Sequence, residues 1–124
     1  MRLLLDTHVF LWWRAGREMR AEAMEAIRTS DDVFVSAASA WEVSIKAATG
    51  KIRLTASSFA DGVAQSGFVP LPINLVHAAV AGELPPHHRD PFDRMLVAQA
   101  RAERLTLVSH DSRLEPYGTP IIWA

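Results

Sequence analysis

The chain has 124 residues, of which 49% are hydrophobic, and this is the size of one domain with one core. Its 13 Lys and Arg residues nearly balance its 14 Asp and Glu residues, so any polyanionic partner must be held by a local basic patch. The absence of Cys excludes disulfides and thiolate metal sites. Since no apolar run approaches the ~20 residues that span a bilayer, we expect one soluble, cytoplasmic domain over residues 1–124 that does not associate with membranes.

Short apolar runs alternate with longer stretches whose apolar residues recur at helical spacing, which is the pattern of βαβ units. The predicted strands are, in chain order, Arg2–Leu5, Val33–Val35, Phe68–Leu71, Thr106–Val108 and Ile121–Trp123. Because these runs are apolar throughout, we expect a parallel sheet that is buried on both faces. Helices are predicted from after Asp6 through Trp13, around Met19–Ile27, from near Ala37 to Gly50, and from Asp90 to about Arg104.

Four acidic residues lie at the ends of these strands or just beyond them. Asp6 and Asp111 follow the first and fourth strands. Glu42 lies in the helix after the second strand, and Asp93 lies in the first turn of the helix that Asp90 begins. Ligands of open parallel sheets bind at the carboxyl ends of the strands, where the strand order reverses. If the order is 3-2-1-4-5, the four acids share one crevice.

Crowded carboxylates repel one another, and proteins tolerate this repulsion where a cation lies among them. A set of oxygen ligands without Cys suits Mg²⁺ or Mn²⁺. The sequence therefore predicts a site for Mg²⁺ or Mn²⁺ at this edge of the sheet.

Three of these acids also have a structural interpretation. Asp6 could cap the helix that follows it, and Asp111 could be a turn residue. Glu42 could form a capping box with Ser39, and it precedes Lys46 by one helical turn. We favour a functional site because one topology brings all the acids together.

The segment "DPFD" holds two acids with different expected roles. Asp90 is the better helix cap because Pro91 follows it, and Asp93 would favour the helix dipole in the first turn. Asp90 remains an alternative to Asp93 in the site.

Four segments carry a family resemblance: "LLLDTHVFLWW" (Leu3–Trp13), "VSAASAWEVSIKAATGKI" (Val35–Ile52), "HRDPFDRMLVAQA" (His88–Ala100) and "LVSHDSRLEPY" (Leu107–Tyr117). Together they resemble the PIN-domain ribonucleases, and more closely the VapC-type toxins of bacterial toxin–antitoxin pairs. The resemblance implies a three-layer α/β/α fold with a 3-2-1-4-5 sheet, metal-dependent cleavage of RNA, a homodimer, and inhibition by a small antitoxin. We expect this antitoxin to insert an Arg among the carboxylates, because a bidentate Arg can replace a metal there.

By position, the acidic quartet of that family corresponds to Asp6, Glu42, Asp93 and Asp111, and Ser109 corresponds to its Ser or Thr near the metal. We expect Asp6 and Asp93 to hold the principal Mg²⁺. Glu42 and Asp111 would bind a second ion or orient the attacking water.

Some neighbouring residues are candidates for contacting the metal ligands or the RNA. Those expected beside the metal ligands are Thr7, Asp90, Ser109 and Arg94. The cations expected around the crevice are Arg14, Lys46, Lys51, Arg53, Arg89 and Arg94. A surface Arg such as Arg94 could equally point to solvent.

The aromatic residues and the histidine pair receive structural interpretations. We place Trp41 in the core and assign Trp12 and Trp13 to a subunit or antitoxin contact. We interpret His87 and His88 as part of a solvated turn, because adjacent histidines lack the spacing of a metal site.

Two other classes of protein are consistent with the size and the acids. A phosphoacceptor receiver domain needs an Asp at the end of its middle strand, and the third strand, "FVPLPIN", has none. A catalytically silent PIN fold is disfavoured only because the acidic quartet is complete.

Overall fold

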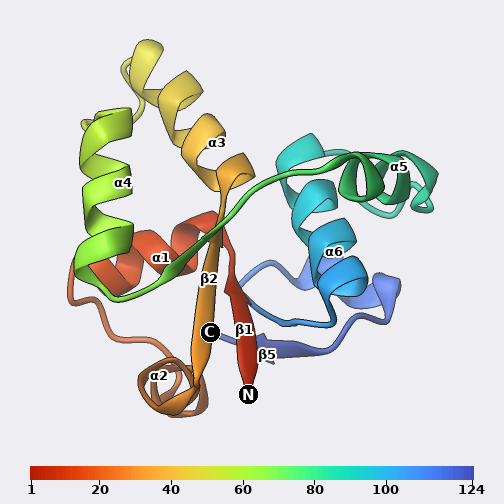
Figure 1. Ribbon diagram of the computed structural model, residues 1–124, viewed down its shortest axis with the longest axis horizontal. Helices are drawn as coiled ribbons and strands as arrows, with labels where there is room; N and C mark the ends of the chain where they lie inside the picture. The colour runs from red at the N-terminus through yellow and green to blue at the C-terminus, as the bar shows by residue number, and fades with distance from the viewer.

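The computed structural model describes residues 1–124 and has a five-stranded parallel sheet at its centre (Figure 1). The strands lie in the order β3-β2-β1-β4-β5, and their bounds are β1 Arg2–Leu5, β2 Asp32–Ser36, β3 Val69–Leu71, β4 Thr106–Ser109 and β5 Ile121–Trp123. In the register of the sheet, Leu5 of β1 pairs with Val35 of β2 and Val108 of β4. The predicted α/β fold and 3-2-1-4-5 order are therefore confirmed.

Six α-helices and one 3-10 helix connect and cover the strands. Their bounds are α1 Thr7–Arg14, α2 Ala21–Thr29, α3 Ala37–Ala48, α4 Ala56–Gln65, α5 Leu75–Glu83, α6 Pro91–Glu103 and the 3-10 helix η1 Ser112–Tyr117. The prediction of a helix at Met19–Ile27 corresponds to α2, which begins and ends two residues later. None of the helices combines the length and the hydrophobicity that a membrane span requires.

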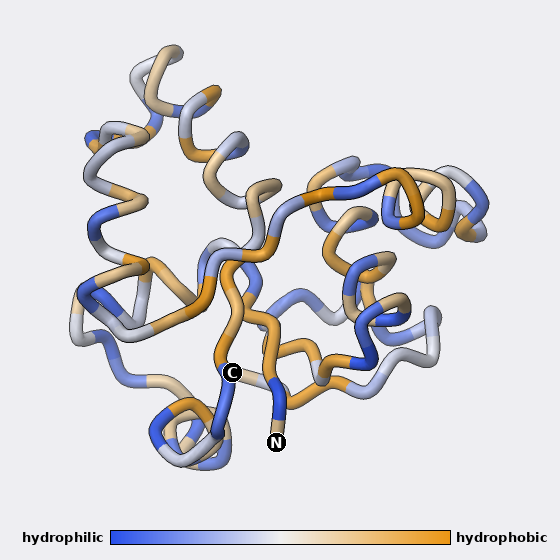
Figure 2. The backbone as a smooth tube through the Cα atoms, viewed as in Figure 1, coloured by the Kyte–Doolittle hydropathy of each residue, from blue (hydrophilic) through white to orange (hydrophobic).

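The three consecutive leucines of β1 divide the interior into two layers. Leu3 and Leu5 pack in a core with residues of α1, α2, α3 and α4, whereas Leu4 packs in a second core with residues of α6 and η1. Side chains alternate between the faces of a strand, so a strand covered on both faces must be apolar throughout. Figure 2 shows this hydrophobic centre, and Figure 1 shows α3 and α4 on one side and α5 and α6 on the other.

Helix α3 differs from the prediction in its cap and in its buried face. Ser36, whose hydroxyl accepts from the Ala38 backbone N–H, caps the helix, so the capping box with Ser39 is wrong. The core position predicted for Trp41 is also wrong, because this side chain is 62% exposed and packs edge-on against Phe92, with ring centroids 5.3 Å apart. The face that α3 buries carries small residues together with Glu42 and Val43.

Candidate metal centre

Asp6 lies at the carboxyl end of β1 and is a helix cap as well as a buried acid. Its Oδ1 accepts from the Val9 backbone N–H at 2.8 Å, and its Oδ2 accepts from the Ser109 hydroxyl at 2.6 Å. Burial raises the pKa of Asp6, although both hydrogen bonds act to lower it. Capping and a place in the acidic site are therefore not exclusive for this residue.

Ser109 connects Asp6 to Asp111 at the end of the neighbouring strand. Its hydroxyl donates to Asp6 and accepts from the Asp111 backbone N–H at 3.0 Å. The Arg113 guanidinium, with Nη2 2.8 Å from Asp111 Oδ2, holds the pKa of Asp111 well below its usual range. Asp111 also accepts from the Arg113 backbone N–H at 3.0 Å and caps η1, which agrees with its alternative interpretation as a turn residue. Its role as a metal ligand stays a prediction.

The two acids of "DPFD" have separate roles. Asp90 Oδ1 accepts from the backbone N–H groups of Phe92 and Asp93 at 2.8 and 3.2 Å, so the prediction that Asp90 caps α6 is confirmed. Asp93 has a pKa raised to about 7, by burial first and then by the negative charges of Asp90, Asp6 and Asp111, with His88 opposing them. Asp93 is therefore a carboxyl group of the cluster on which a negative charge is unfavourable without a cation.

His88 is part of this cluster, and its prediction as a solvated turn residue is wrong. The side chain is buried, and its Nε2 lies 3.0 Å from Asp111 Oδ2 and 3.0 Å from Asp93 Oδ2. The prediction fits only His87, which is exposed and packs edge-on against Tyr117 at 5.1 Å between centroids. The one local signal for His88 is its place two residues before the cap of α6, and this signal does not indicate a long-range contact.

Glu42 is buried and already has a cation beside it. The Thr7 hydroxyl donates to Glu42 Oε1 at 2.7 Å, and Lys46 Nζ donates to Oε2 at 2.7 Å. Glu42, like Asp6, is not among the His88, Asp93 and Asp111 side chains, whose ligand atoms lie within 4.8 Å of one another. Its role as a metal ligand stays a prediction, as does that of Thr7, which contacts Glu42 rather than an Asp side chain.

Arg94 points neither into the crevice nor to solvent. Its guanidinium donates to the backbone carbonyls of Ala81, Leu84 and Pro85 at 2.8, 3.0 and 3.0 Å. Both interpretations of Arg94, as an RNA contact and as a solvent-facing residue, are wrong, because it ties the end of α5 to α6. Arg94 thereby fixes the connection between α5 and α6, and His88 lies in this connection.

A cavity of about 340 Å³ opens beside the acids and has an aromatic wall. Its lining residues are Asp6, His8, Trp12, His110, Asp111, Ser112 and Arg113. The ring of Trp12 lies 5.1 Å from that of His110, and the Arg17 guanidinium lies 4.5 Å from the centroid of Trp12. One side of this cavity is therefore anionic and the other is aromatic and basic.

The donor set at this edge of the sheet fits a hard divalent cation. Asp93 Oδ1 accepts no hydrogen bond from the protein. The raised pKa of Asp93 shows that the protein does not compensate a negative charge on this carboxyl group. Oxygen atoms of Asp6, Asp93 and Asp111 are the ligand type that Mg²⁺ and Mn²⁺ prefer. The residues present are therefore suited to such an ion.

The chain has an α/β fold with a parallel sheet of order 3-2-1-4-5, and acids follow β1 and β4 and begin α6. Comparisons with known proteins identify the family that has this fold. Residues 3–118 match the PIN domain, and the chain belongs to this family. It is 32% identical over 126 residues to Ribonuclease VapC22 of Mycobacterium tuberculosis, which covers 95% of this chain and 93% of the relative. Membership of the PIN family excludes the receiver-domain alternative.

Solved structures show the same fold at lower sequence identity. Chains of two crystal structures, VapBC2 of Rickettsia felis bound to a DNA fragment from their promoter and DNA-bound VapBC of Salmonella typhimurium, each align with a TM-score of 0.73 and 14% identity. Each alignment covers 99% of this chain and 98% of the matched chain.

Proposed function

We propose that this protein is a Mg²⁺- or Mn²⁺-dependent endoribonuclease that acts as the toxin of a toxin–antitoxin pair. The observation that carries the proposal is that Asp6, Asp93 and Asp111 come together at the carboxyl edge of the sheet, where burial and the negative charges of Asp90, Asp6 and Asp111 raise the pKa of Asp93 to about 7. The relative VapC22 is named a ribonuclease, and this supports RNA as the substrate.

In this proposal the acids share the binding of the metal. Asp6 and Asp93 hold the principal ion, and Asp111 contributes from the end of β4. A bound divalent ion neutralises charge that develops on a phosphate and makes water a better nucleophile. Ser109 keeps the Asp6 carboxylate oriented through its 2.6 Å hydrogen bond. Glu42, whose charge Lys46 offsets, is assigned to orienting the water or to a second ion.

The cavity beside Asp6 and Asp111 could hold one nucleotide of the RNA, because it has acidic side chains on one side and an aromatic wall on the other. A phosphate would lie at its anionic side through the metal. A base would pack against Trp12 at its aromatic side, and this role replaces the subunit or antitoxin contact expected for Trp12 from the sequence. Base stacking on an aromatic side chain is worth about 1–3 kcal/mol per base. Arg113, His8 and His110 line this cavity, and Arg17 packs on Trp12. These residues replace Arg94 as the basic or donor groups for RNA.

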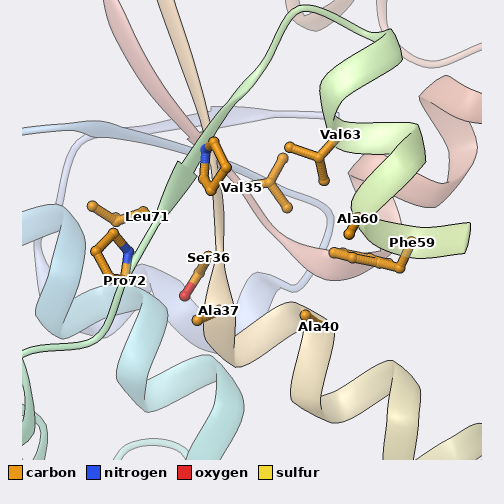
Figure 3. A pocket seen from close by; sticks show the side chains of 10 residues that line it. Val35, Ser36, Ala37, Ala40, Phe59, Ala60, Val63, Leu71 and Pro72 are labelled. Carbon is orange, nitrogen blue, oxygen red and sulfur yellow. The ribbon is translucent and has the colours of Figure 1, made fainter. Parts of the chain in front are cut away.

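We assign the binding of the antitoxin to an apolar cavity of the protein. This cavity of about 400 Å³ lies between β2, β3, α3 and α4 (Figure 3), and its walls include Val35, Ala40, Phe59, Val63 and Leu71. Structural neighbours of the chain come from toxin–antitoxin complexes, which supports an antitoxin as the occupant. An Arg of the same antitoxin would reach the carboxylates.

A homodimer is supported by apolar side chains that the single chain leaves uncovered. At the start of α5, Leu75 is 89% exposed and Val76 is 61% exposed, and Ile73 lies just before them. Adjoining apolar side chains that are exposed to this degree are typical of protein interfaces.

The proposal is tested by expressing the protein without its antitoxin and sequencing the 5′ ends of the RNAs that accumulate. We expect discrete cleavage sites, and we expect the Asp93→Asn variant, expressed at the same level, to give none. Absence of discrete sites in the wild type would contradict the nuclease proposal and would favour a catalytically silent PIN fold.

A further inference from the structure

We infer that His88 is a positioning residue that donates its Nε2–H to the Asp111 carboxylate beside Asp93 and is not itself a ligand of the metal. The inference rests on the proposed function, since it concerns how this centre binds a divalent ion. It also assigns a role to a side chain whose distances alone would suggest a histidine ligand, because its Nε2 is 3.0 Å from two carboxylate oxygens.

The hydrogen bond to the other ring nitrogen fixes the tautomer of His88. The backbone N–H of Asp90 donates to His88 Nδ1 at 3.1 Å. A backbone N–H can only donate, so Nδ1 must be the unprotonated nitrogen, and the neutral ring carries its hydrogen on Nε2. Histidines that bind metals normally show the opposite arrangement, in which the second nitrogen donates its N–H to a carbonyl or carboxylate. A lone pair for a metal is therefore absent from the nitrogen that faces the acids.

The Nε2–H instead donates to Asp111 and lies next to Asp93. It forms a 3.0 Å hydrogen bond to Asp111 Oδ2, and Asp93 Oδ2 lies at the same distance from the nitrogen. These contacts take one oxygen of each carboxylate. Asp93 Oδ1 has no donor from the protein and remains available to an ion. His88 thus orients the ligands while the ion contacts oxygen atoms.

The surrounding structure prevents His88 from turning its other nitrogen toward the acids. The side chain of His88 is 4% exposed, and the backbone N–H of His88 donates to the Tyr117 hydroxyl at 3.0 Å. That hydroxyl donates in turn to the Pro85 carbonyl at 2.9 Å, and Arg94 binds the same carbonyl. Rotation of the ring would also break the bond from Asp90.

The tautomer is measured directly by two-bond ¹H–¹⁵N correlation spectra of the histidines in the wild-type protein, first without metal and then with Mg²⁺. We expect His88 to carry its proton on Nε2 in both states. A proton on Nδ1 without metal, or its transfer from Nε2 to Nδ1 when Mg²⁺ is added, would overturn the inference.

Metal selectivity separates a positioning residue from a ligand in a second way. Oxygen ligands suit Mg²⁺ and Mn²⁺, whereas an imidazole ligand favours Ni²⁺. Removal of a residue that orients the ligands of a metal typically weakens binding by about 10- to 100-fold. We expect His88→Asn to weaken Mg²⁺ and Ni²⁺ binding by the same factor in calorimetry, and a much larger loss for Ni²⁺ than for Mg²⁺ would show that His88 is a ligand.

Two further variants control this measurement. In His88→Gln the amide nitrogen can take the place of Nε2 and donate to the carboxylates, so we expect it to bind metal more tightly than His88→Asn. His87→Ala removes the exposed neighbouring histidine and should bind metal as the wild type does. If His88→Gln binds no better than His88→Asn, the donor role is wrong.

The outcomes also separate this inference from the proposed function. A protein with its proton on Nε2 that does not cleave RNA would contradict the nuclease proposal but not the assignment of His88. An active nuclease with its His88 proton on Nδ1 would contradict the assignment alone.

Discussion

The hydroxyl of Ser109 donates a 2.6 Å hydrogen bond to the Asp6 carboxylate across 103 residues of sequence. The same oxygen accepts the Asp111 backbone N–H, so one buried side chain joins the carboxyl ends of β1 and β4. In an open parallel sheet this edge is where ligands bind. The acidic centre therefore depends on a neutral residue as well as on its acids.

Ser109→Ala should destabilise the protein and weaken its metal site. Asp6 Oδ2 would lose its donor while remaining buried, and an unsatisfied buried group costs about 1–3 kcal/mol. The pKa of Asp6 should rise further, because the Ser109 hydrogen bond now lowers it. Urea unfolding and Mn²⁺ titration measure the two effects. Ser109→Thr keeps the hydroxyl and is the matched control; an alanine variant with wild-type stability and Mn²⁺ affinity would show that the bond is unimportant.

The two acids of "DPFD" should separate in an assay of Mn²⁺-dependent RNA cleavage. Asp93→Asn should remove most of the activity, because it removes the carboxylate that the other acids surround. Asp90→Asn should keep most of it, because Asn caps a helix nearly as well as Asp. The reverse result, with Asp90→Asn inactive and Asp93→Asn active, would show that the assignment within this segment is wrong.

The metal-free protein should lose stability as the pH rises from 5 to 8. Asp93 has a pKa of about 7 when folded and an ordinary value of 3.8 otherwise, so between these values the folded state holds a proton that the unfolded chain has released. The free energy of unfolding then falls with rising pH, by at most about 1.4 kcal/mol per pH unit. The raised pKa of Asp6 acts in the same direction. The lowered pKa of Asp111 acts below pH 3.8, where its stabilisation is lost as the pH falls.

Urea unfolding in the presence of a chelator tests this pH dependence. The free energy of unfolding of the wild type should fall by about 2 kcal/mol between pH 5 and pH 8 because of Asp93. In Asp93→Asn this contribution is absent, so the fall should be smaller by about 2 kcal/mol. Equal slopes in the two proteins would mean that Asp93 is an ordinary surface acid.

Trp12→Ala should impair RNA binding more than it impairs metal binding. A base that stacks on this ring contributes about 1–3 kcal/mol, so KM for a short RNA should rise about 5- to 150-fold while Mn²⁺ affinity is unchanged. Trp12→Phe keeps an aromatic face and should recover much of the loss. An unchanged KM in Trp12→Ala would remove Trp12 from the RNA site.

Much of this architecture could be predicted from the sequence. The apolar run of β1 and its terminal Asp6 indicated a strand buried on both faces with an acid at its end, and both features are present. Asp90 was predictable as a cap because capping depends on neighbours in sequence. These features follow from local patterns.

What could not be predicted depends on contacts between distant segments. His88 lies in a turn without periodicity, and its partners arrive from α6 and from the end of β4. Trp41 appeared to belong to the core because it is large and apolar, but α3 buries the face that carries Glu42 and small residues. Arg94 had the charge of an RNA contact, and only the position of the α5–α6 connection shows that carbonyl groups take its donors.

The most direct test of the acidic centre is the melting temperature of the wild type and of Asp6→Asn, each with and without Mn²⁺, with RNA cleavage measured on the same samples. A ligand at a hundredfold excess over its Kd stabilises the folded state by ~2.7 kcal/mol, which shifts the melting of a domain of this size by several degrees. Asn can still cap α1, and it relieves the repulsion among the acids, so the metal-free variant should melt at or slightly above the wild type. We predict that Mn²⁺ raises the melting temperature of the wild type only, and that Asp6→Asn folds but does not cleave RNA. A variant that melts much earlier without metal, or that responds to Mn²⁺ as the wild type does, would show that Asp6 has a structural role and is not a metal ligand.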